Sequence, residues 1–255
     1  ELRAHLVDSG VVNMELASTA FCRVARTPSF IGAGSAFMDA PGPFERPGLL
    51  AQFYVTLPDP AWPVEVRDDW LVKLHPCGLR NTAAHEVYPG HLLQFLHLGH
   101  HPSNAARALT SYAGVEGWAH YAEQLLIEAD IAHGNPRAEL AQLNMALLRD
   151  CRLLVALDLH AGAVTLPEAA DFIAAHTHLP PIRCRQEALR GAQDPGYLNY
   201  TLGKLMLLKL RSDYARQEGQ RYSLRRFHDA LLSCGAPPLP LARRMLLADP
   251  SEPAL

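Results

Sequence analysis

The stretch His85–Gln94 reads HEVYPGHLLQ and places two histidines six positions apart, with a glutamate directly after the first. On a regular helix, six residues at about 100° each leave the two side chains roughly 120° apart, so both could not point at one metal ion. Proline interrupts a helix and glycine permits unusual backbone angles, so Pro89-Gly90 can loop out two residues. His85 and His91 then regain the one-turn spacing of a zinc-binding pair, with Glu86 as general base.

A second motif, EGWAHYAE, follows at positions 116–123. A zinc hydrolase needs a third protein ligand and an open position for water. We predict Glu116 as this ligand, because the 25 residues after His91 allow one helix to end and another to return antiparallel beside it. His120 and Glu123 share a helix face with Glu116, and each is a competing ligand or a residue that orients a ligand.

The two motifs lie in a part of the chain with helical periodicity. From about Leu79 onward, apolar residues recur at three- and four-residue spacing, which is typical of amphipathic helices. Residues 28–66 are instead rich in proline, glycine and aromatics, which indicates a few strands and turns. We therefore predict a mainly α protein with a small antiparallel β-sheet near the N-terminus. The expected parts are a β-containing portion (1–78), a helical zinc-binding portion (79–248) and a loose tail (249–255).

Several helix starts can be predicted from local chemistry. Asn135 before Pro136 is typical of an N-cap followed by proline in the first helical position. Thr165 and Glu168 have the spacing of a capping box, and Ser223 can cap a further helix.

Composition excludes several classes of function. The chain has 255 residues with a formal net charge of −3, so it lacks the basic character of nucleic-acid or anionic-membrane binders. No apolar run approaches the roughly 18–20 residues of a membrane span. The five cysteines are odd in number and form no CxxC pair, which favours a reducing compartment. We expect a cytoplasmic protein, or a periplasmic or secreted one if a signal lies upstream. The sequence does not indicate an oligomeric state.

The two motifs closely resemble HExxPGHxxQ and EGWAxYAE of the bacterial DUF885 family, which is similar to the gluzincin metallopeptidases. The resemblance continues in RLLVALDLH (152–160) and PGYLNYTLGKLMLLKLR (195–211), and covers most of residues 30–247. It implies a gluzincin-like helical catalytic region. Family members are usually about twice as long, which implies that this chain is the C-terminal part of a longer one.

The resemblance also implies roles for individual residues. His85, His91 and Glu116 would hold one zinc ion, and Glu86 would be the base. Tyr200, in a Tyr-x-x-Gly pattern, is similar to the hydroxyl donor that gluzincins place over the reacting carbonyl.

These residues predict a zinc-dependent hydrolase that cleaves short peptides. Zinc would lower the pKa of its bound water toward about 7. Glu86 would take the proton and pass it to the leaving amine, and Tyr200 would stabilise the oxyanion. Three further residues, on the helix that follows Pro136, could orient a ligand or a substrate carboxylate: Arg152, Asp158 and His160.

Two other interpretations use the same residues. Two histidines and one carboxylate are also the ligands of non-haem iron oxygenases. Those enzymes typically sit on β-scaffolds and need no glutamate after the first histidine, so both features favour zinc. The third interpretation is a non-catalytic helical protein with a structural metal, in which His120 could fill a closed fourth position. The sequence does not determine the substrate, or whether cleavage is internal or terminal.

Overall fold

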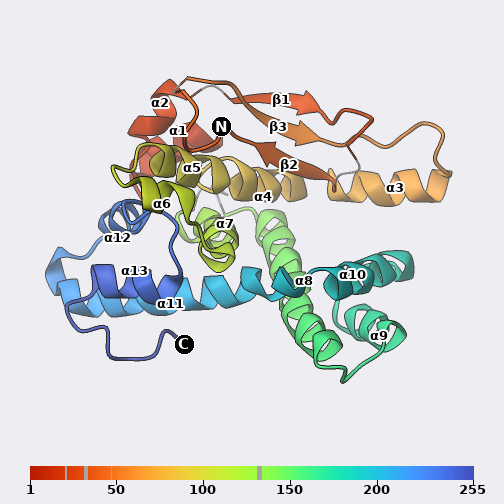
Figure 1. Cartoon of the computed structure of the whole chain (residues 1–255). Coiled ribbons are helices and arrows are strands. Elements are labelled where there is room, and N and C mark those ends of the chain that lie inside the picture. The colour runs from red at the N-terminus through yellow and green to blue at the C-terminus, as the bar shows by residue number, and fades with distance from the viewer. Residues whose placement is uncertain (21, 32–33, 47, 131–133) are drawn as a thin grey trace.

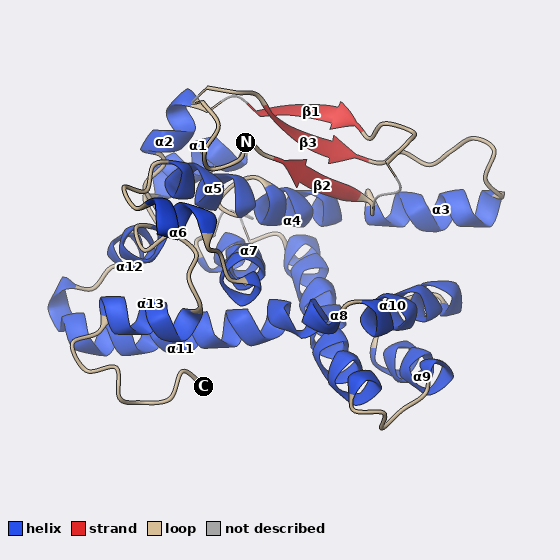
Figure 2. Ribbon diagram, viewed as in Figure 1, coloured by secondary structure: helices blue, strands red, loops and turns tan. Residues whose placement is uncertain are grey.

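The computed structural model describes residues 1–255 except 21, 32–33, 47 and 131–133. The described part is mainly helical with one three-stranded sheet near the N-terminus, as predicted (Figure 1). Figure 2 shows the sheet along one side of the molecule, with strand β2 beside helix α4. Within the described residues, none of the helices combines the length and apolar character needed to cross a bilayer.

The helices account for most of the described chain. Three of them (α1–α3) lie in the predicted β-containing portion, and α4 begins just before position 79. In chain order they are α1 (Leu2–Ser9), α2 (Glu15–Thr19), α3 (Val64–Lys73), α4 (Pro76–Glu86), α5 (His91–Gly99), α6 (Asn104–Ala108), α7 (Tyr112–Glu128), α8 (Pro136–His160), α9 (Leu166–His176), α10 (Pro181–Gln193), α11 (Asn199–Glu218), α12 (Leu224–Leu232) and α13 (Leu239–Leu246), with 3-10 turns η1 (Pro195–Leu198) and η2 (Gly219–Arg221).

The sheet corrects the prediction of an antiparallel arrangement. Its strands are β1 (Cys22–Arg26), β2 (Ala36–Asp39) and β3 (Ala51–Val55), in the order β1-β3-β2. β3 pairs antiparallel with β2, as predicted, but parallel with β1. The last strand inserts between two strands that run in opposite directions, so it can be antiparallel to only one of them. Proline and glycine signals specify local reversals, whereas this insertion is a long-range choice.

The predicted helix caps are confirmed. The Asn135 side chain accepts a hydrogen bond from the amide of Arg137. Thr165 and Glu168 form the complete reciprocal capping box. Ser223 accepts from the amide of Arg226 at 3.1 Å. Each cap depends on residues within one turn, which is why the sequence is sufficient to predict it.

The C-terminal segment 249–255 contains no helix or strand. It is nevertheless anchored, because the Glu252 carboxylate pairs with Lys209 at 2.6 Å and with Arg216 at 3.0 Å. The Arg243 side chain also donates to the carbonyl of Glu252.

Helices α7 and α11 pack at very short range because glycines face each other. A Cβ on Gly117 would lie 2.5 Å from the carbonyl carbon of Gly203, and a Cβ on Gly203 would lie 2.2 Å from the carbonyl oxygen of Ala113. Glycine is therefore the residue that this contact requires. The contact also brings together Glu116, next to the first glycine, and Tyr200, one turn before the second.

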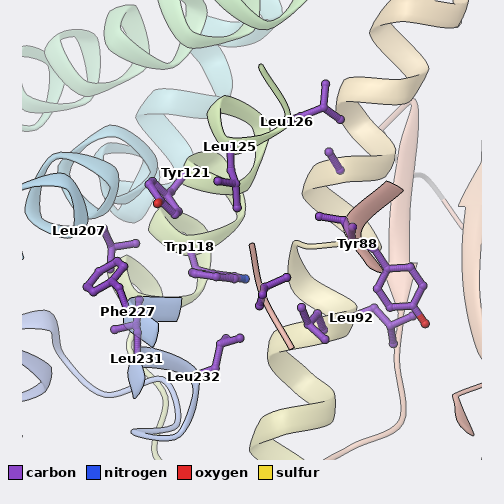
Figure 3. Close-up of a cluster of buried hydrophobic side chains, with 14 of the residues drawn as sticks. Tyr88, Leu92, Trp118, Tyr121, Leu125, Leu126, Leu207, Phe227, Leu231 and Leu232 are labelled. Carbon is purple, nitrogen blue, oxygen red and sulfur yellow. The ribbon is translucent and has the colours of Figure 1, made fainter. Parts of the chain in front are cut away.

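The largest buried cluster joins the helices around this contact. Figure 3 shows Trp118 and Tyr121 of α7 in one group with Leu207 of α11 and Phe227 of α12. Burial of such large apolar side chains is the main source of folding free energy. The motif helix α7 is therefore a central element of the core as well as a source of site residues.

A buried polar chain crosses this core. Arg211 donates to the Tyr121 hydroxyl at 3.0 Å, and that hydroxyl pairs with Nε2 of His228 at 2.7 Å. On the other side of the ring, Nδ1 donates to the carbonyl of Val11 at 2.7 Å. This network links α7, α11, α12 and the N-terminal segment, with the imidazole neutral.

We expect stability to fall on acidification between pH 6.5 and 4, in part because of His228. Burial lowers the pKa of His228 from 6.5 to about 4. Below pH 6.5 the His228 side chain binds a proton in the unfolded chain but stays neutral in the folded chain. The contribution of the neutral His228 to the free energy of unfolding is therefore complete above pH 6.5 and is lost as the pH falls to 4. The loss is about 3 kcal/mol. Urea unfolding at several pH values should show this loss in the parent and a smaller one in His228→Gln.

The exposed His176 on α9 offers a matched control. His176→Gln should retain the pH dependence of the parent. If His228→Gln also retained it in full, the assignment to His228 would be wrong.

Candidate metal centre

The Pro-Gly insertion separates two helices. α4 ends with His85-Glu86 and α5 begins with His91, so the intervening break comprises Val87 to Gly90. A Cβ on Gly90 would lie 1.8 Å from the carbonyl oxygen of His85, although its φ of −72° is outside the left-handed region. The close approach of the backbone therefore requires glycine here. The Trp118 indole donates to the carbonyls of Pro89 and Gly90, which holds the break against α7.

The break brings the three predicted ligands together. Nε2 of His85 lies 3.4 Å from Oε2 of Glu116, and Nε2 of His91 lies 3.5 Å from the same oxygen. Among the described residues these three form a group whose ligand atoms all lie within 4.8 Å of one another. Donors about 2.0–2.1 Å from a tetrahedral zinc ion would lie about 3.4 Å apart. Both histidine-to-glutamate distances match this spacing.

The electrostatics of the cluster favour positive charge. Burial alone would lower the pKa of His85, but the adjacent carboxylates of Glu116 and Glu123 outweigh this effect and raise the pKa to about 9. The two histidines hold the pKa of Glu116 well below its usual value, against the effect of burial. Oε2 of Glu116 is buried without a hydrogen-bond partner among the described residues. An orphaned carboxylate oxygen between two imidazoles is suited to a cation.

Glu123 orients His85 and does not belong to the ligand group. Its fully buried carboxylate pairs with Nδ1 of His85 at 2.7 Å, which directs Nε2 toward Glu116. Asn81 donates to it at 3.0 Å, and Arg149 pairs with it at 2.6 Å. Carboxylates behind metal-binding histidines fix the tautomer and ring orientation in this way. The sequence analysis missed Asn81 and Arg149, because no local motif marks a residue whose partner comes from another helix.

His120, the other competing ligand, also lies outside the ligand group. It is buried, and its Nδ1 lies 3.6 Å from Glu123. Burial lowers the pKa of His120 to about 4, so the ring is neutral at pH 7.

Glu86 lies at the wall of a cavity and is positioned by the sheet. Its Oε2 accepts a hydrogen bond from the backbone amide of Met38 in β2 at 3.0 Å. The cavity has a volume of about 440 Å³ and is lined by Gly34, Ser35, Ala36, Phe37, Met38, Thr82, His85, Glu86, His91, Phe95, Val115, Glu116, Met145, Arg149, Arg152, Arg190 and Tyr200. The candidate base and the three candidate ligands therefore face the same space.

Tyr200 is also in the cavity wall. Its ring centroid lies 6.3 Å from that of His85 and 6.1 Å from that of Tyr112. Burial raises the pKa of Tyr200, so its hydroxyl remains protonated and able to donate. Tyr112, which the sequence analysis missed, donates to Asp194 at 3.2 Å.

Of the three candidates on α8, only Arg152 reaches the cavity. Asp158 and His160 are exposed and do not line it. The Asp158 side chain projects about 120° around the helix from that of Arg152, and His160 is about 12 Å further along the axis. The prediction that these two orient a ligand is therefore corrected. His160 instead pairs with the carbonyl of Gly191.

Comparisons with known proteins identify a family and a fold. A model of the family described as "Bacterial protein of unknown function (DUF885)" matches residues 8–246. A solved structure from Colwellia psychrerythraea is 24% identical with a TM-score of 0.78, covering 95% of this chain and 42% of that one. A second solved structure, from Shewanella oneidensis, is 22% identical with a TM-score of 0.83. The match covers 96% of this chain and 43% of that one. Both are described as a "putative lipoprotein".

The chain thus spans less than half the length of these two proteins, and the likeness establishes a shared fold. No curated protein matches the chain.

Proposed function

We propose that this chain, which belongs to the DUF885 family of bacterial proteins, carries the catalytic site of a zinc-dependent hydrolase that cleaves short peptides. One observation carries the proposal. Ligand atoms of His85, His91 and Glu116 converge within 4.8 Å at the wall of a cavity that Glu86 also lines.

The donor set fits zinc in a catalytic site. Two imidazoles and one carboxylate leave a fourth position free for water. A structural metal would call for a fourth protein ligand, but the candidate His120 faces Glu123. The predominantly helical surroundings and the glutamate directly after His85 also support zinc over non-haem iron.

The residues of the chain supply the remaining chemistry. His85, His91 and Glu116 would hold the zinc ion, which would supply a Lewis acid and a water that ionises near neutral pH. Glu86, held through one oxygen by the Met38 amide, can take a proton from that water and transfer it to the leaving amine. The protonated Tyr200 hydroxyl can donate to the developing oxyanion.

The edge strand β2 supports a peptide as substrate. The Met38 amide points away from β3, toward Glu86, and successive residues of a strand alternate in direction. The N–H and C=O of Ala36 therefore also face outward, on a residue that lines the cavity. An extended peptide can pair with such a free edge. The volume of about 440 Å³ lies within the roughly 300–1,000 Å³ of small-ligand pockets, which suits a short peptide.

The location of the protein is part of this proposal. Both solved relatives are described as a "putative lipoprotein", which supports the periplasmic or secreted alternative over the predicted cytoplasmic one.

Metal analysis combined with digestion of a peptide library tests the proposal. We expect about one zinc ion per chain, and cleavage that a chelator abolishes and added zinc restores. Iron as the dominant metal, or cleavage that persists in excess chelator, would contradict the proposed activity.

A further inference from the structure

Three arginines line the cavity, but two of them are already neutralised. Arg149 pairs with Glu123 at 2.6 Å, and Arg152 pairs with Glu187 at 2.9 Å, with all four side chains buried. Arg190 has no carboxylate within salt-bridge distance and no hydrogen-bond partner among the described residues. It is the cavity arginine whose charge and donors remain available to a ligand.

Arg190 is held in place by an aromatic ring. Its guanidinium carbon lies 4.9 Å from the ring centroid of Tyr197. Tyr197 is itself fully buried and donates its hydroxyl to Glu187. A guanidinium on an aromatic face keeps its N–H donors free for a planar partner such as a carboxylate.

The position of Arg190 relates it to the candidate metal centre. The Tyr197 ring lies 6.3 Å from that of Tyr200, and the Tyr200 ring lies 6.3 Å from that of His85. Three successive contacts, the guanidinium on Tyr197 and then two ring–ring contacts, thus link Arg190 to the ligand cluster. Because an extended peptide advances about 3.3 Å per residue, this separation corresponds to no more than about five residues.

Negative and uncompensated positive charges lie in different parts of the cavity. The acidic lining residues are Glu86 and Glu116, both at the candidate metal centre. Arg190 supplies uncompensated positive charge away from them. A substrate with a neutral scissile bond at the metal and a carboxylate a few residues beyond would match this distribution.

We propose that Arg190 binds the free C-terminal α-carboxylate of the peptide substrate. The protein would then cleave near the C-terminal ends of peptides. The proposal rests on the proposed hydrolase function and adds to it a substrate class. It also replaces Arg152, one of the three residues predicted from the sequence to orient a ligand or a substrate carboxylate, because Glu187 already neutralises Arg152.

Binding measurements in the zinc-loaded Glu86→Gln background test this inference without turnover. The probes are a short unblocked peptide, the same peptide as a C-terminal amide, and a pair of amides that carry Glu or Gln at the last position. We expect the acid to bind about 10- to 100-fold more tightly than its amide, the range for a hydrogen bond to a charged group. Arg190→Gln should remove this preference, and Arg190→Lys should restore part of it.

Arg185→Gln is the matched control, because Arg185 is exposed on the same helix and does not line the cavity. It should preserve the preference. Equal binding of acid and amide, or a preference that survives in Arg190→Gln, would overturn the inference. A preference only for the Glu-containing amide would overturn the assignment to the C-terminus.

The outcome is separable from that of the proposed function. If the library remains uncut while the acid preference depends on Arg190, the carboxylate site stands and the hydrolase proposal fails. If the library is cut but acid and amide bind equally, the hydrolase proposal stands and this inference fails.

Discussion

Replacing Glu86 by glutamine should leave zinc binding intact and lower the rate of peptide hydrolysis by about 10²–10⁴-fold, the usual contribution of a positioned general base. Glutamine has the same shape and can still accept from the Met38 amide, so the side chain should keep its place. It cannot take a proton from water, so the loss should fall on kcat. Steady-state kinetics and metal analysis of the same preparation measure both quantities.

Glu65→Gln offers a control, because Glu65 is an exposed carboxylate on α3. It should change neither zinc content nor rate. If Glu86→Gln lost zinc, Glu86 would be a ligand; if it kept the full rate, another group would be the base.

Replacing His85 or His91 by alanine should weaken zinc binding by more than about a hundredfold. Each histidine supplies one of three converging ligand atoms. Loss of a residue that only orients a ligand already lowers metal affinity by roughly 10–100-fold, so loss of a ligand should lower it further. Glu123→Gln should lower zinc affinity by that smaller amount, because it weakens the hydrogen bond that orients His85 without removing a ligand. Titration against a chromophoric chelator measures these affinities.

The pH dependence of the same titration gives a second readout. Glu116 and Glu123 raise the pKa of His85 to about 9 in the metal-free protein. Zinc must displace this proton, so apparent affinity should rise with pH up to about 9 and fall as pH decreases.

His100→Ala is the control for these variants, since His100 is exposed at the end of α5. Circular dichroism should confirm that each variant remains helical. The assigned ligand set would be refuted if His85→Ala still bound one zinc ion with the affinity of the parent. It would also be refuted if His100→Ala lost as much zinc affinity as His85→Ala.

The candidate ligands could be predicted because their signal is local. His85, Glu86 and His91 are marked by residue type and by the Pro-Gly break, and the structure brings the two histidines together with Glu116 at a cavity that Glu86 also lines. The helix caps were predictable for the same reason. The role of Glu123 was not, because the same face of α7 carries Glu116 and Glu123, and only the neighbouring helices determine which carboxylate reaches the cluster and which lies behind His85.

The sequence by itself determined a mainly helical protein, the starts of three capped helices and the pairing of His85-Glu86 with His91 around a Pro-Gly break, since these depend on residues within a few turns. Tertiary structure alone decided the parallel pairing of β1 with β3 and the exclusion of Asp158 and His160 from the cavity. It also decided that Glu187 forms a salt bridge with Arg152 and that Arg190 remains available to a ligand. The physical reason is that strand insertion and charge pairing depend on which distant segments meet, and a single residue's type does not specify its partner.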